Sequence, residues 1–445
     1  MKSTTTPPPT PMPLRRVLMT WLPLAGSWLL MGAELPALSA FVARLAEPEI
    51  NLAAYGGIVF PLALIIESPI IMLLAASTAL SKDWASYRKI YAFMMTSGAA
   101  LTALHIAVAF TPLYYFVVEG ILGAPQEIVE PARIGLMIMT PWTWSIAYRR
   151  FNQGVLIRFG HPKAVTVGTL IRLSADLIVL TIGLIVGTIP GIVVATSAVA
   201  AGVISEALFI GLSARPVIRN ELRQAPAVEP SLSFSAFMKF YIPLAMTSLL
   251  TLMIQPIGSA AISRMPRALE SLAVWPVVIG LSFLFRSTGV AYNEVVVSLM
   301  DEPGSSPTLR RFAGLLVGFV TVLQLVMVAT PLADIWFRRV SGLPHNLINL
   351  AITGMWLALL LPGLNAIQSW YQGTILFSRR TRGIPEAVVI FLVTIGAVLW
   401  AGVTWNQVNG LYFGLTAFTL GMAAQAIWLW VRSRPAMTQV NARDT

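Results

Sequence analysis

The chain has 445 residues, of which 56% are hydrophobic and only 11% are charged. An ordinary soluble domain is about a quarter charged, so this composition excludes a soluble fold and indicates an integral membrane protein. The absence of cysteine excludes disulfides, zinc–thiolate sites and thiol catalysis. The net charge of +11 is spread in short clusters between apolar runs, so we expect no nucleic-acid partner.

The first 16 residues are rich in threonine and proline and predict a disordered cytoplasmic tail. Beyond them lie apolar stretches that each reach the roughly 20 residues needed by a membrane-spanning helix. The first stretch is too long for a signal peptide and has a twin later in the chain, so we expect it to be a helix. The stretches lie at residues 17–44, 50–80, 89–117, 128–158, 163–187, 190–214, 236–263, 268–298, 311–338, 346–377, 384–404 and 409–431. The predicted fold is all-α, with 12 transmembrane helices.

Two distant segments share a pattern of proline, leucine and alanine. Residues 21–44 align without gaps with residues 241–264, at an offset of 220, and both prolines of the first segment match prolines of the second. At an offset of 219, residues 111–113 match residues 330–332, and Gln153-Gly154 matches Gln372-Gly373. Each half holds an even number of helices, which predicts a parallel repeat about an axis along the membrane normal. We expect two six-helix bundles related by a pseudo-twofold axis.

This repeat predicts the domain organisation. We expect a six-helix lobe at 17–218, a polar cytoplasmic linker at 219–233, a second six-helix lobe at 234–433 and a cytoplasmic tail at 434–445. With the N-terminus in the cytoplasm, 20 Lys and Arg residues fall on the inside and 6 on the outside. Basic residues are enriched on the cytoplasmic side of membrane proteins. The sequence therefore predicts a multi-pass protein of the cell's inner (plasma) membrane with both termini in the cytoplasm.

Four arginines lie inside the predicted spans, where a charge is costly unless it is paired or faces water. Our candidate substrate-binding residues are Arg149, Arg150, Arg172 and Arg286. A guanidinium binds a carboxylate or phosphate through paired N–H donors, so these residues predict an anionic substrate. Two alternatives stay open: Arg149 and Arg150 snorkel to the cytoplasm, or Arg172 is neutralised by Asp176, four residues further on.

Five carboxylates lie in the same spans. Glu34, Glu67 and Asp176 are candidate sites for a coupling Na⁺ or H⁺, with a purely structural role as the alternative. Glu34 also stands just before Pro36, a predicted kink that frees backbone carbonyls. The remaining two, Glu206 and Glu294, lie closer to the predicted cytoplasmic helix ends, and we expect both to be solvated.

The repeat also relates charges in the two lobes. Glu67 aligns with Ser287, the neighbour of Arg286. We therefore predict that Glu67 and Arg286 face each other across a central cavity between the lobes and form an ion pair that breaks during transport.

Neither catalysis nor metal binding is indicated. The three histidines, His105, His161 and His345, are far apart, and His105 within a span is predicted to be a hydrogen-bonded core residue. The sequence contains no P-loop, HExxH or GxSxG motif. We expect no enzymatic activity and no cofactor other than the coupling Na⁺ or H⁺.

Several short segments carry a family resemblance. They are Leu52-Ala53-Ala54-Tyr55-Gly56, His105 to Val118, Asn152 to Leu156, Ser174-Ala175-Asp176 and Gln255 to Arg264. Together with the two six-helix bundles and the Pro-containing first helix, they resemble the MOP flippase superfamily, which includes the MATE transporters. Within it they most resemble the progressive ankylosis protein family.

This resemblance implies a secondary transporter that exports small organic or phosphate-bearing anions. We expect it to work by alternating access, as a monomer in the lipid bilayer. A Na⁺- or H⁺-coupled exporter of cationic drugs is the first alternative, as in MATE relatives. A lipid-linked precursor flippase is the second, although such flippases typically have fourteen helices. A membrane scaffold or receptor with purely structural buried charges is the third.

Overall fold

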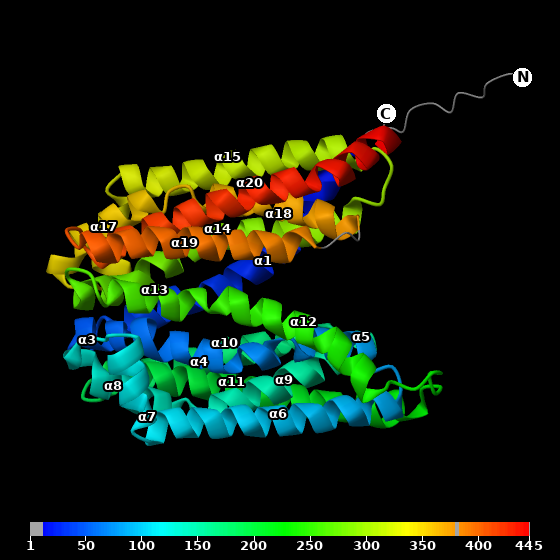
Figure 1. The fold of residues 1–445 in the computed structure, drawn as a ribbon, viewed down its shortest axis with the longest axis horizontal. Helices are drawn as coiled ribbons and strands as arrows, with labels where there is room; N and C mark the ends of the chain where they lie inside the picture. Colours follow the sequence, from blue (N-terminus) through cyan, green and yellow to red (C-terminus); the bar gives the residue numbers. More distant parts are fainter. Residues whose placement is uncertain (1–11, 379–381, 445) are drawn as a thin grey trace, which may run out of the picture. The chain divides into compact units, whose positions relative to one another are not determined.

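The computed structural model describes residues 12–378 and 382–444, and every regular element in these ranges is a helix (Figure 1). The predicted all-α class is confirmed. Of the predicted tail at 1–16, residues 1–11 lie outside the described residues, and α1 begins at Leu14. At the other end, the last helix continues to Asp444, through most of the predicted tail at 434–445.

The first half of the chain forms a series of helices, with two short π-helices among them. In order they are α1 (Leu14–Gly32), α2 (Glu34–Val42), α3 (Pro48–Ala53), η1 (Ala54–Val59), α4 (Phe60–Ile71), α5 (Leu73–Leu80), α6 (Trp84–Phe110), α7 (Leu113–Tyr115), η2 (Phe116–Ile121), α8 (Gln126–Ile138), α9 (Thr140–Arg158), α10 (Lys163–Val186) and α11 (Gly191–Asn220). The 3-10 helix η3 (Leu222–Gln224) follows in the linker.

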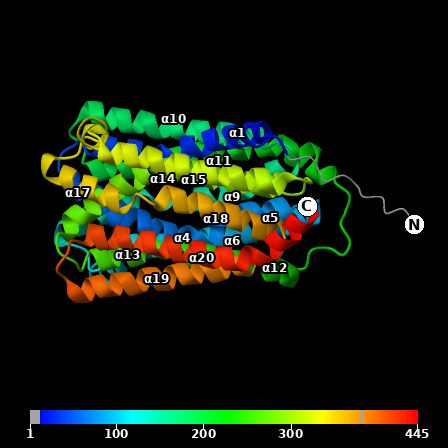
Figure 2. The ribbon, with the colours of Figure 1, turned by 90° about the horizontal axis from the view of Figure 1, so that it is seen from above.

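The second half repeats this order. Its elements are α12 (Phe234–Leu252), α13 (Ile254–Ile262), α14 (Ala268–Leu299), α15 (Ser305–Ala329), α16 (Leu332–Ile335), η4 (Trp336–Val340), α17 (His345–Leu357), α18 (Leu361–Phe377), α19 (Gly383–Trp405) and α20 (Gly410–Asp444). Long helices such as α10 and α19 run nearly straight (Figure 2). Together with the first half, they make 12 spans when consecutive segments of one broken helix are joined.

Eleven of these spans are apolar enough to cross a membrane by length and hydropathy. The twelfth, α8–α9, is not among them, because α9 carries two central arginines and many of its other residues are polar or aromatic. Its counterpart in the second half, α17–α18, does qualify. The fourth span therefore takes the place of a membrane span in the repeat, but its polar and charged residues lower its hydropathy.

The turns confirm the repeat independently of the helices. Glu47 and Arg267, 220 residues apart, are non-glycine residues with positive φ, at +50° and +56°. Gly187 and Asn406, 219 residues apart, end α10 and α19 in the same left-handed conformation, with φ of +69° and +49°. Because few residues other than glycine adopt positive φ, the recurrence of this conformation at the offsets of 220 and 219 shows that the two halves fold alike.

The matched glycines Gly154 and Gly373 mark close helix crossings. A methyl group added at Gly154 in α9 would lie 2.6 Å from the carbonyl oxygen of Leu74 in α5. At Gly373 in α18 it would lie 2.7 Å from Cβ of Val296 in α14. In each half the fourth span thus crosses the second at a point where only a hydrogen atom fits.

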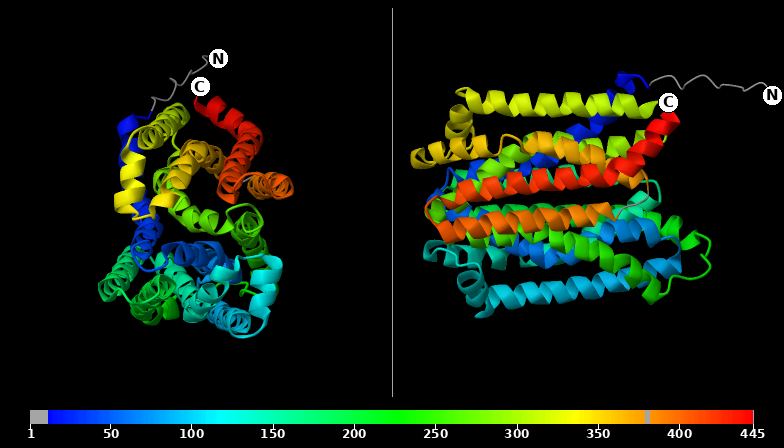
Figure 3. Two further views of the ribbon diagram at one scale, coloured as in Figure 1. Left: turned by 90° about the vertical axis from the view of Figure 1, so that its left-hand side faces the viewer. Right: turned by 45° about the horizontal axis from the view of Figure 1, so that its top comes forward.

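Packing divides the chain into two compact units: unit 1 contains the described residues of 1–37 and 276–445, and unit 2 contains residues 38–275. In unit 1, α1 packs against α15, and α18 packs against α15 and α20. In unit 2, α12 and α13 pack against α4. The end-on view shows the helices of these bundles in cross-section (Figure 3, left). The first span of each repeat half therefore packs largely with helices of the other half. The predicted lobes at 17–218 and 234–433 instead follow the boundaries of the repeat, so each includes its own first span.

Hydrogen bonds hold the linker between the halves against the start of α6. Asp83 caps this helix by accepting the Ser86 N–H at 2.8 Å, and its second oxygen accepts the Val228 N–H at 2.8 Å. Lys89 Nζ donates to the Leu232 carbonyl at 2.6 Å. Burial alone would raise the pKa of Asp83, but the hydrogen bonds from Val228 and Ser86, with nearby Lys89, outweigh it and lower the pKa. One carboxylate thus serves both a helix end and the linker.

Replacing Asp83 with alanine should destabilise the protein by roughly 0.5–2 kcal/mol, the usual cost of losing an N-cap. Because the pKa of Asp83 is lower in the folded protein, its carboxylate stabilises the folded state at pH values above the unfolded-state pKa. This stabilisation is lost as the pH falls through the folded-state pKa. Asp83→Asn keeps a capping oxygen but does not titrate, so it is the matched control. Thermal unfolding between about pH 7 and about pH 3 should show a steeper acid loss in wild type than in Asp83→Asn. Parallel profiles would exclude this role.

Candidate functional site

Unit 2 gathers charged side chains inside the bundle, on four helices that pack against one another. Their helices are linked by the packing of α9 on α4 and α11 and of α10 on α11. We call this group the charged cluster; it consists of Glu67 on α4, Arg149 and Arg150 on α9, Arg172 and Asp176 on α10, and Glu206 on α11. A charge away from water needs a partner, so the contacts of each member determine what it can do.

Glu206 is the centre of the cluster, with 1% of its surface exposed. Its Oε2 accepts a hydrogen bond from Arg149 Nη1 and lies 3.7 Å from Arg172 Nε, and its Oε1 accepts from Gln153 Nε2 at 2.9 Å. The prediction that Glu206 is solvated is therefore wrong. It assumed that the sixth span ends at residue 214, whereas α11 continues to Asn220 and places Glu206 well inside the helix.

Arg149 does not snorkel. Its side chain is buried, with the residue 5% exposed, and points across to α11. Gln153, four residues further along α9, lies on the same helix face and binds the other oxygen of the same carboxylate. Arg149 thus reaches a buried partner in the bundle, as is required of a charge with no route to water.

The second half contains the same contact without the charges. At an offset of 219, Gln368 replaces Arg149 and Gln425 replaces Glu206, and Gln368 Nε2 lies 3.2 Å from Gln425 Oε1. Gln368 also donates to the Met422 carbonyl at 2.8 Å. The α9–α11 and α18–α20 interfaces are therefore built alike, and only the first holds an ion pair.

Asp176 lies at a second position where the two halves pack in the same way. It is buried against α11 at Gly202, where an added methyl group would overlap the carboxylate and lie 2.7 Å from its Cγ. In the second half, Ile395 takes the place of Asp176 and packs on Gly421, with its Cγ1 2.6 Å from an added methyl group. The side chain that packs on the glycine is thus apolar in the second half and a carboxylate in the first.

Glu67 and Arg150 complete the cluster without ion pairs of their own. Glu67 is 3% exposed, and its Oε2 has no hydrogen-bond partner among the described residues. It interacts electrostatically with Arg149, Arg150 and Arg172. Arg150 is part-buried, and no carboxylate within the described part of unit 2 lies within 4.0 Å of it. With all members ionised, three arginines face three carboxylates.

The other predicted site residues lie in unit 1. Arg286 on α14 is part-buried between aromatic rings, with its Cζ 5.2 Å from the Phe418 ring centre and 5.9 Å from that of Phe283. Glu34 is the first residue of α2, after the helix break at Ala33. Because Glu34 and Arg286 belong to one unit and Glu67 and Asp176 to the other, the Glu67–Arg286 ion pair stays a prediction.

Two further residues behave as the sequence indicated. Glu294 is exposed and accepts a hydrogen bond from the Trp28 indole at 3.1 Å. His105 is fully buried, with Nε2 2.9 Å from the Leu136 carbonyl and Nδ1 2.9 Å from Thr143 Oγ1. Since a carbonyl can only accept, Nε2 carries the proton and the ring is held as a core residue.

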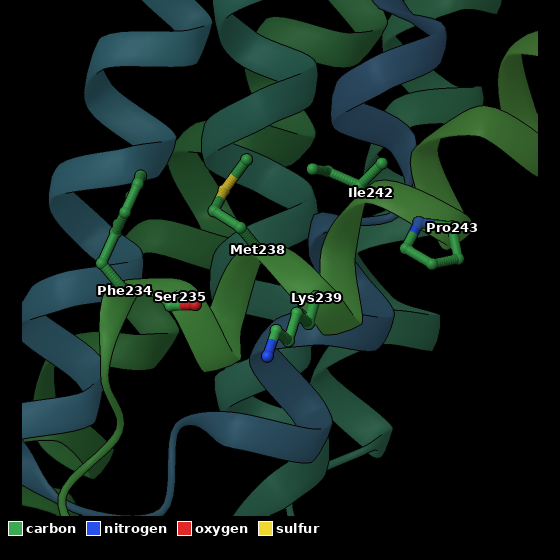
Figure 4. Close-up of a pocket in the computed structure, with 6 residues that line it drawn as sticks. All are labelled: Phe234, Ser235, Met238, Lys239, Ile242 and Pro243. Atoms are coloured by element: carbon green, nitrogen blue, oxygen red, sulfur yellow. The ribbon is translucent and has the colours of Figure 1, made fainter.

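A cavity of about 430 Å³ lies elsewhere in unit 2, along α12. All its lining residues come from this one helix (Figure 4): Phe234, Ser235, Met238, Lys239, Ile242 and Pro243. The lining is apolar apart from one hydroxyl and one ammonium, and no predicted site residue contributes to it. Across the described residues, no group of three metal-ligating side chains is found.

No protein-family profile and no curated protein matches the chain. Among solved structures, an inward-facing multidrug resistance MATE family transporter of the MOP superfamily matches with a TM-score of 0.71 at 14% identity, over 96% of this chain and 99% of its own. The lipid II flippase MurJ in an inward closed conformation matches with a TM-score of 0.60 at 12% identity, over 93% and 90%.

A third match is a MOP superfamily transporter from Pyrococcus furiosus, described as having a binding pocket of reverse polarity. Its TM-score is 0.56 at 14% identity, over 96% of this chain and 100% of its own. At such identities the likeness is one of fold. The chain is a multi-pass membrane protein with the 12-helix repeat fold of the MOP superfamily, the fold of the MATE transporters.

Proposed function

We propose that the chain is an alternating-access secondary transporter that exports small organic or phosphate-bearing anions. The fold supports the transporter class, because the structures it matches include the same MATE architecture in inward-facing and outward-facing conformations. The family resemblance to progressive ankylosis proteins and the arginines inside the membrane support an anionic substrate. The Lys and Arg distribution supports the inner (plasma) membrane with both termini in the cytoplasm.

One observation carries the choice of an anion. Arg150 and Arg286, one in each unit, have no carboxylate within 4.0 Å among the described residues of their own unit, whereas Arg149 binds Glu206. A part-buried guanidinium with no carboxylate in direct contact has unused N–H donors, and an anionic ligand with paired oxygen acceptors satisfies them. In this proposal Arg150 and Arg286 bind the substrate, while Arg149 and Arg172 hold the surrounding framework.

The carboxylates support coupling to a cation. Glu67 is a buried carboxyl group with one oxygen that has no hydrogen-bond partner in the part of the chain that the structure describes, and either a proton or Na⁺ would satisfy it. Neutralising Glu67 would also leave the three arginines of the charged cluster in excess over Asp176 and Glu206, which favours anion binding. We propose Glu67 as the coupling residue that works with the cluster, with Asp176 and Glu34 as the further candidates. No other cofactor and no enzymatic activity is proposed.

A cationic-drug exporter is the second candidate, because the solved structure with a TM-score of 0.71 is a multidrug resistance transporter. In that case Arg150 and Arg286 have a structural role, and the carboxylates bind the cationic substrate. Flux of labelled organic anions and lipophilic cations through proteoliposomes separates the two candidates by the sign of the preferred substrate. If neither is carried, a scaffold or receptor is favoured.

Replacing Arg286 with alanine should weaken the apparent affinity for an anionic substrate by roughly 10- to 150-fold, the loss of one charge-assisted hydrogen bond. Arg286→Lys should restore only part of it, because lysine keeps the charge but loses the planar fork. The measurement is concentration-dependent uptake of a labelled organic anion by liposomes that contain wild type or either variant.

Arg432→Ala is the matched control for this test. Arg432 is an exposed arginine of the same unit that binds Glu386 at 2.9 Å, so its removal should leave uptake nearly unchanged. Equal affinities for wild type and Arg286→Ala, with both proteins monodisperse by gel filtration, would exclude Arg286 from the substrate path.

A further inference from the structure

Unit 1 contains a polar cavity that is separate from every residue considered above. It has a volume of about 320 Å³ and lies among α15, α18 and α20. Its lining includes Arg310 from α15, Trp370 and Tyr371 from α18, and Trp430 and Arg434 from α20. The Lys and Arg distribution assigns this end of the helices to the cytoplasmic side.

The two arginines of this cavity differ from their neighbours in having no ion pair. Arg432 and Arg382 share the Glu386 carboxylate, at 2.9 Å and 3.3 Å. No carboxylate of the described part of unit 1 lies within 4.0 Å of Arg310 or Arg434; the guanidinium of Arg434 instead lies 4.1 Å from the Trp430 ring centre. Positive charge is therefore concentrated at the cavity without internal compensation.

Two further donors of the cavity are unused. The Trp370 indole N–H and the Tyr371 hydroxyl have no hydrogen-bond partner among the described residues, although Trp370 is only 5% exposed. Both residues line the cavity, so these donors are available to a ligand that enters it. Two cations and two neutral donors around one cavity match a ligand with negative charge and several acceptor oxygens, such as a phosphate group.

The surface beside the cavity indicates which kind of molecule carries that phosphate group. Ile427, Trp430, Val431 and Arg434 are spaced three and four residues apart and so lie along one face of α20. Ile427 is 61% exposed and Val431 40% exposed, within a helix that spans the membrane. This apolar stripe, which ends at a tryptophan and an arginine, fits an acyl chain below a headgroup at the membrane interface.

We propose that the cavity formed by Arg310, Trp370, Tyr371 and Arg434 binds the headgroup phosphate of an anionic phospholipid. The guanidinium groups bind the phosphodiester oxygens, the Trp370 N–H and Tyr371 O–H donate to the same group, and an acyl chain follows the Ile427–Val431 stripe. The site is distinct from the proposed transport residues, so its test does not depend on transport.

The experiment measures binding of fluorescent phosphatidylglycerol to purified, delipidated protein in detergent. Arg310→Gln/Arg434→Gln removes both cations and should weaken binding roughly 10- to 30-fold, from about one kcal/mol for each basic residue near the membrane surface. The matched control, Arg311→Gln/Arg432→Gln, removes the same net charge at the same end of unit 1 and should bind like wild type. Trp370→Phe tests the indole donor without changing charge and should weaken binding by a smaller factor.

Competition identifies the source of the phosphate. Unlabelled phosphatidylglycerol should displace the probe, whereas phosphatidylcholine and inorganic phosphate at the same phosphate concentration should displace little of it. The proposal fails if both double variants weaken binding equally, since attraction would then be non-specific. It also fails if inorganic phosphate competes as well as the lipid, which would make the cavity a site for a soluble anion.

Discussion

Glu206→Gln is expected to cause the largest loss of stability of any single substitution in the charged cluster. The carboxylate accepts from Arg149 and Gln153 and lies 3.7 Å from Arg172, so its neutralisation removes the ion-pair partner of the buried Arg149. Removing one partner of a buried ion pair costs about 3–5 kcal/mol. We expect the thermal midpoint in detergent to fall by roughly 10 °C.

Two variants make this test specific. Glu221→Gln removes the charge of an exposed carboxylate that lies 2.8 Å from His161 Nε2 and should shift the midpoint by a degree or two at most. Arg149→Gln/Glu206→Gln reproduces the Gln368–Gln425 contact of the second half and should recover much of the stability lost in the single variant. If Glu206→Gln is as stable as Glu221→Gln, the buried ion pair does not hold the bundle together.

Gly154→Ala should destabilise unit 2 strongly for a different reason. The added methyl group would lie 2.6 Å from the Leu74 carbonyl oxygen and 2.9 Å from the Thr78 nitrogen, both of which are backbone atoms of α5. Backbone in a packed helix cannot move aside as a flexible side chain can, so α9 must shift. We expect a cost of at least the roughly 1–3 kcal/mol typical of overpacking, measured as a lower thermal midpoint.

Gly258→Ala is the control with the opposite expected sign. No atom lies within 4 Å of a methyl group added at Gly258 in α13, and alanine favours a helix over glycine by up to about 1 kcal/mol. It should leave the midpoint unchanged or raise it slightly. A Gly154→Ala protein with the stability of Gly258→Ala would show that α9 does not cross α5 at this close distance.

The fold was largely predictable because its signals are long and repeated. Apolar stretches of about 20 residues identify spans without knowledge of their packing, and the 219–220 offset identifies two similar halves. The helix ends were less predictable: α6 runs from Trp84 to Phe110, whereas the expected span was 89–117. Hydropathy locates a membrane span, but the ends of a helix depend on local caps such as Asp83 and on turns such as Thr111-Pro112.

The cluster was only partly predictable. Intramembrane position alone singled out Arg149, Arg150, Arg172 and the carboxylates, because each is expensive there. The pairing of Arg149 with Glu206 depends on two helices 57 residues apart, which spacing along one helix cannot reveal. One signal in the sequence could have shown it: Arg149 and Glu206 align with Gln368 and Gln425 at a single offset, which indicates two polar contacts at equivalent places.

The polar fourth span also has a consequence for how the chain enters the membrane. α8–α9 emerges from the ribosome with Arg149 and Arg150, each of which adds about 2.5–3.5 kcal/mol to the cost of insertion at a helix centre. The carboxylate that compensates Arg149 is synthesised 57 residues later. We therefore expect this segment to wait beside the insertion machinery until α11 arrives, so that the helices of the first half partition into lipid as a group. In the second half the amide pair of Gln368 and Gln425 imposes no such delay, and its helices can leave the translocon one at a time.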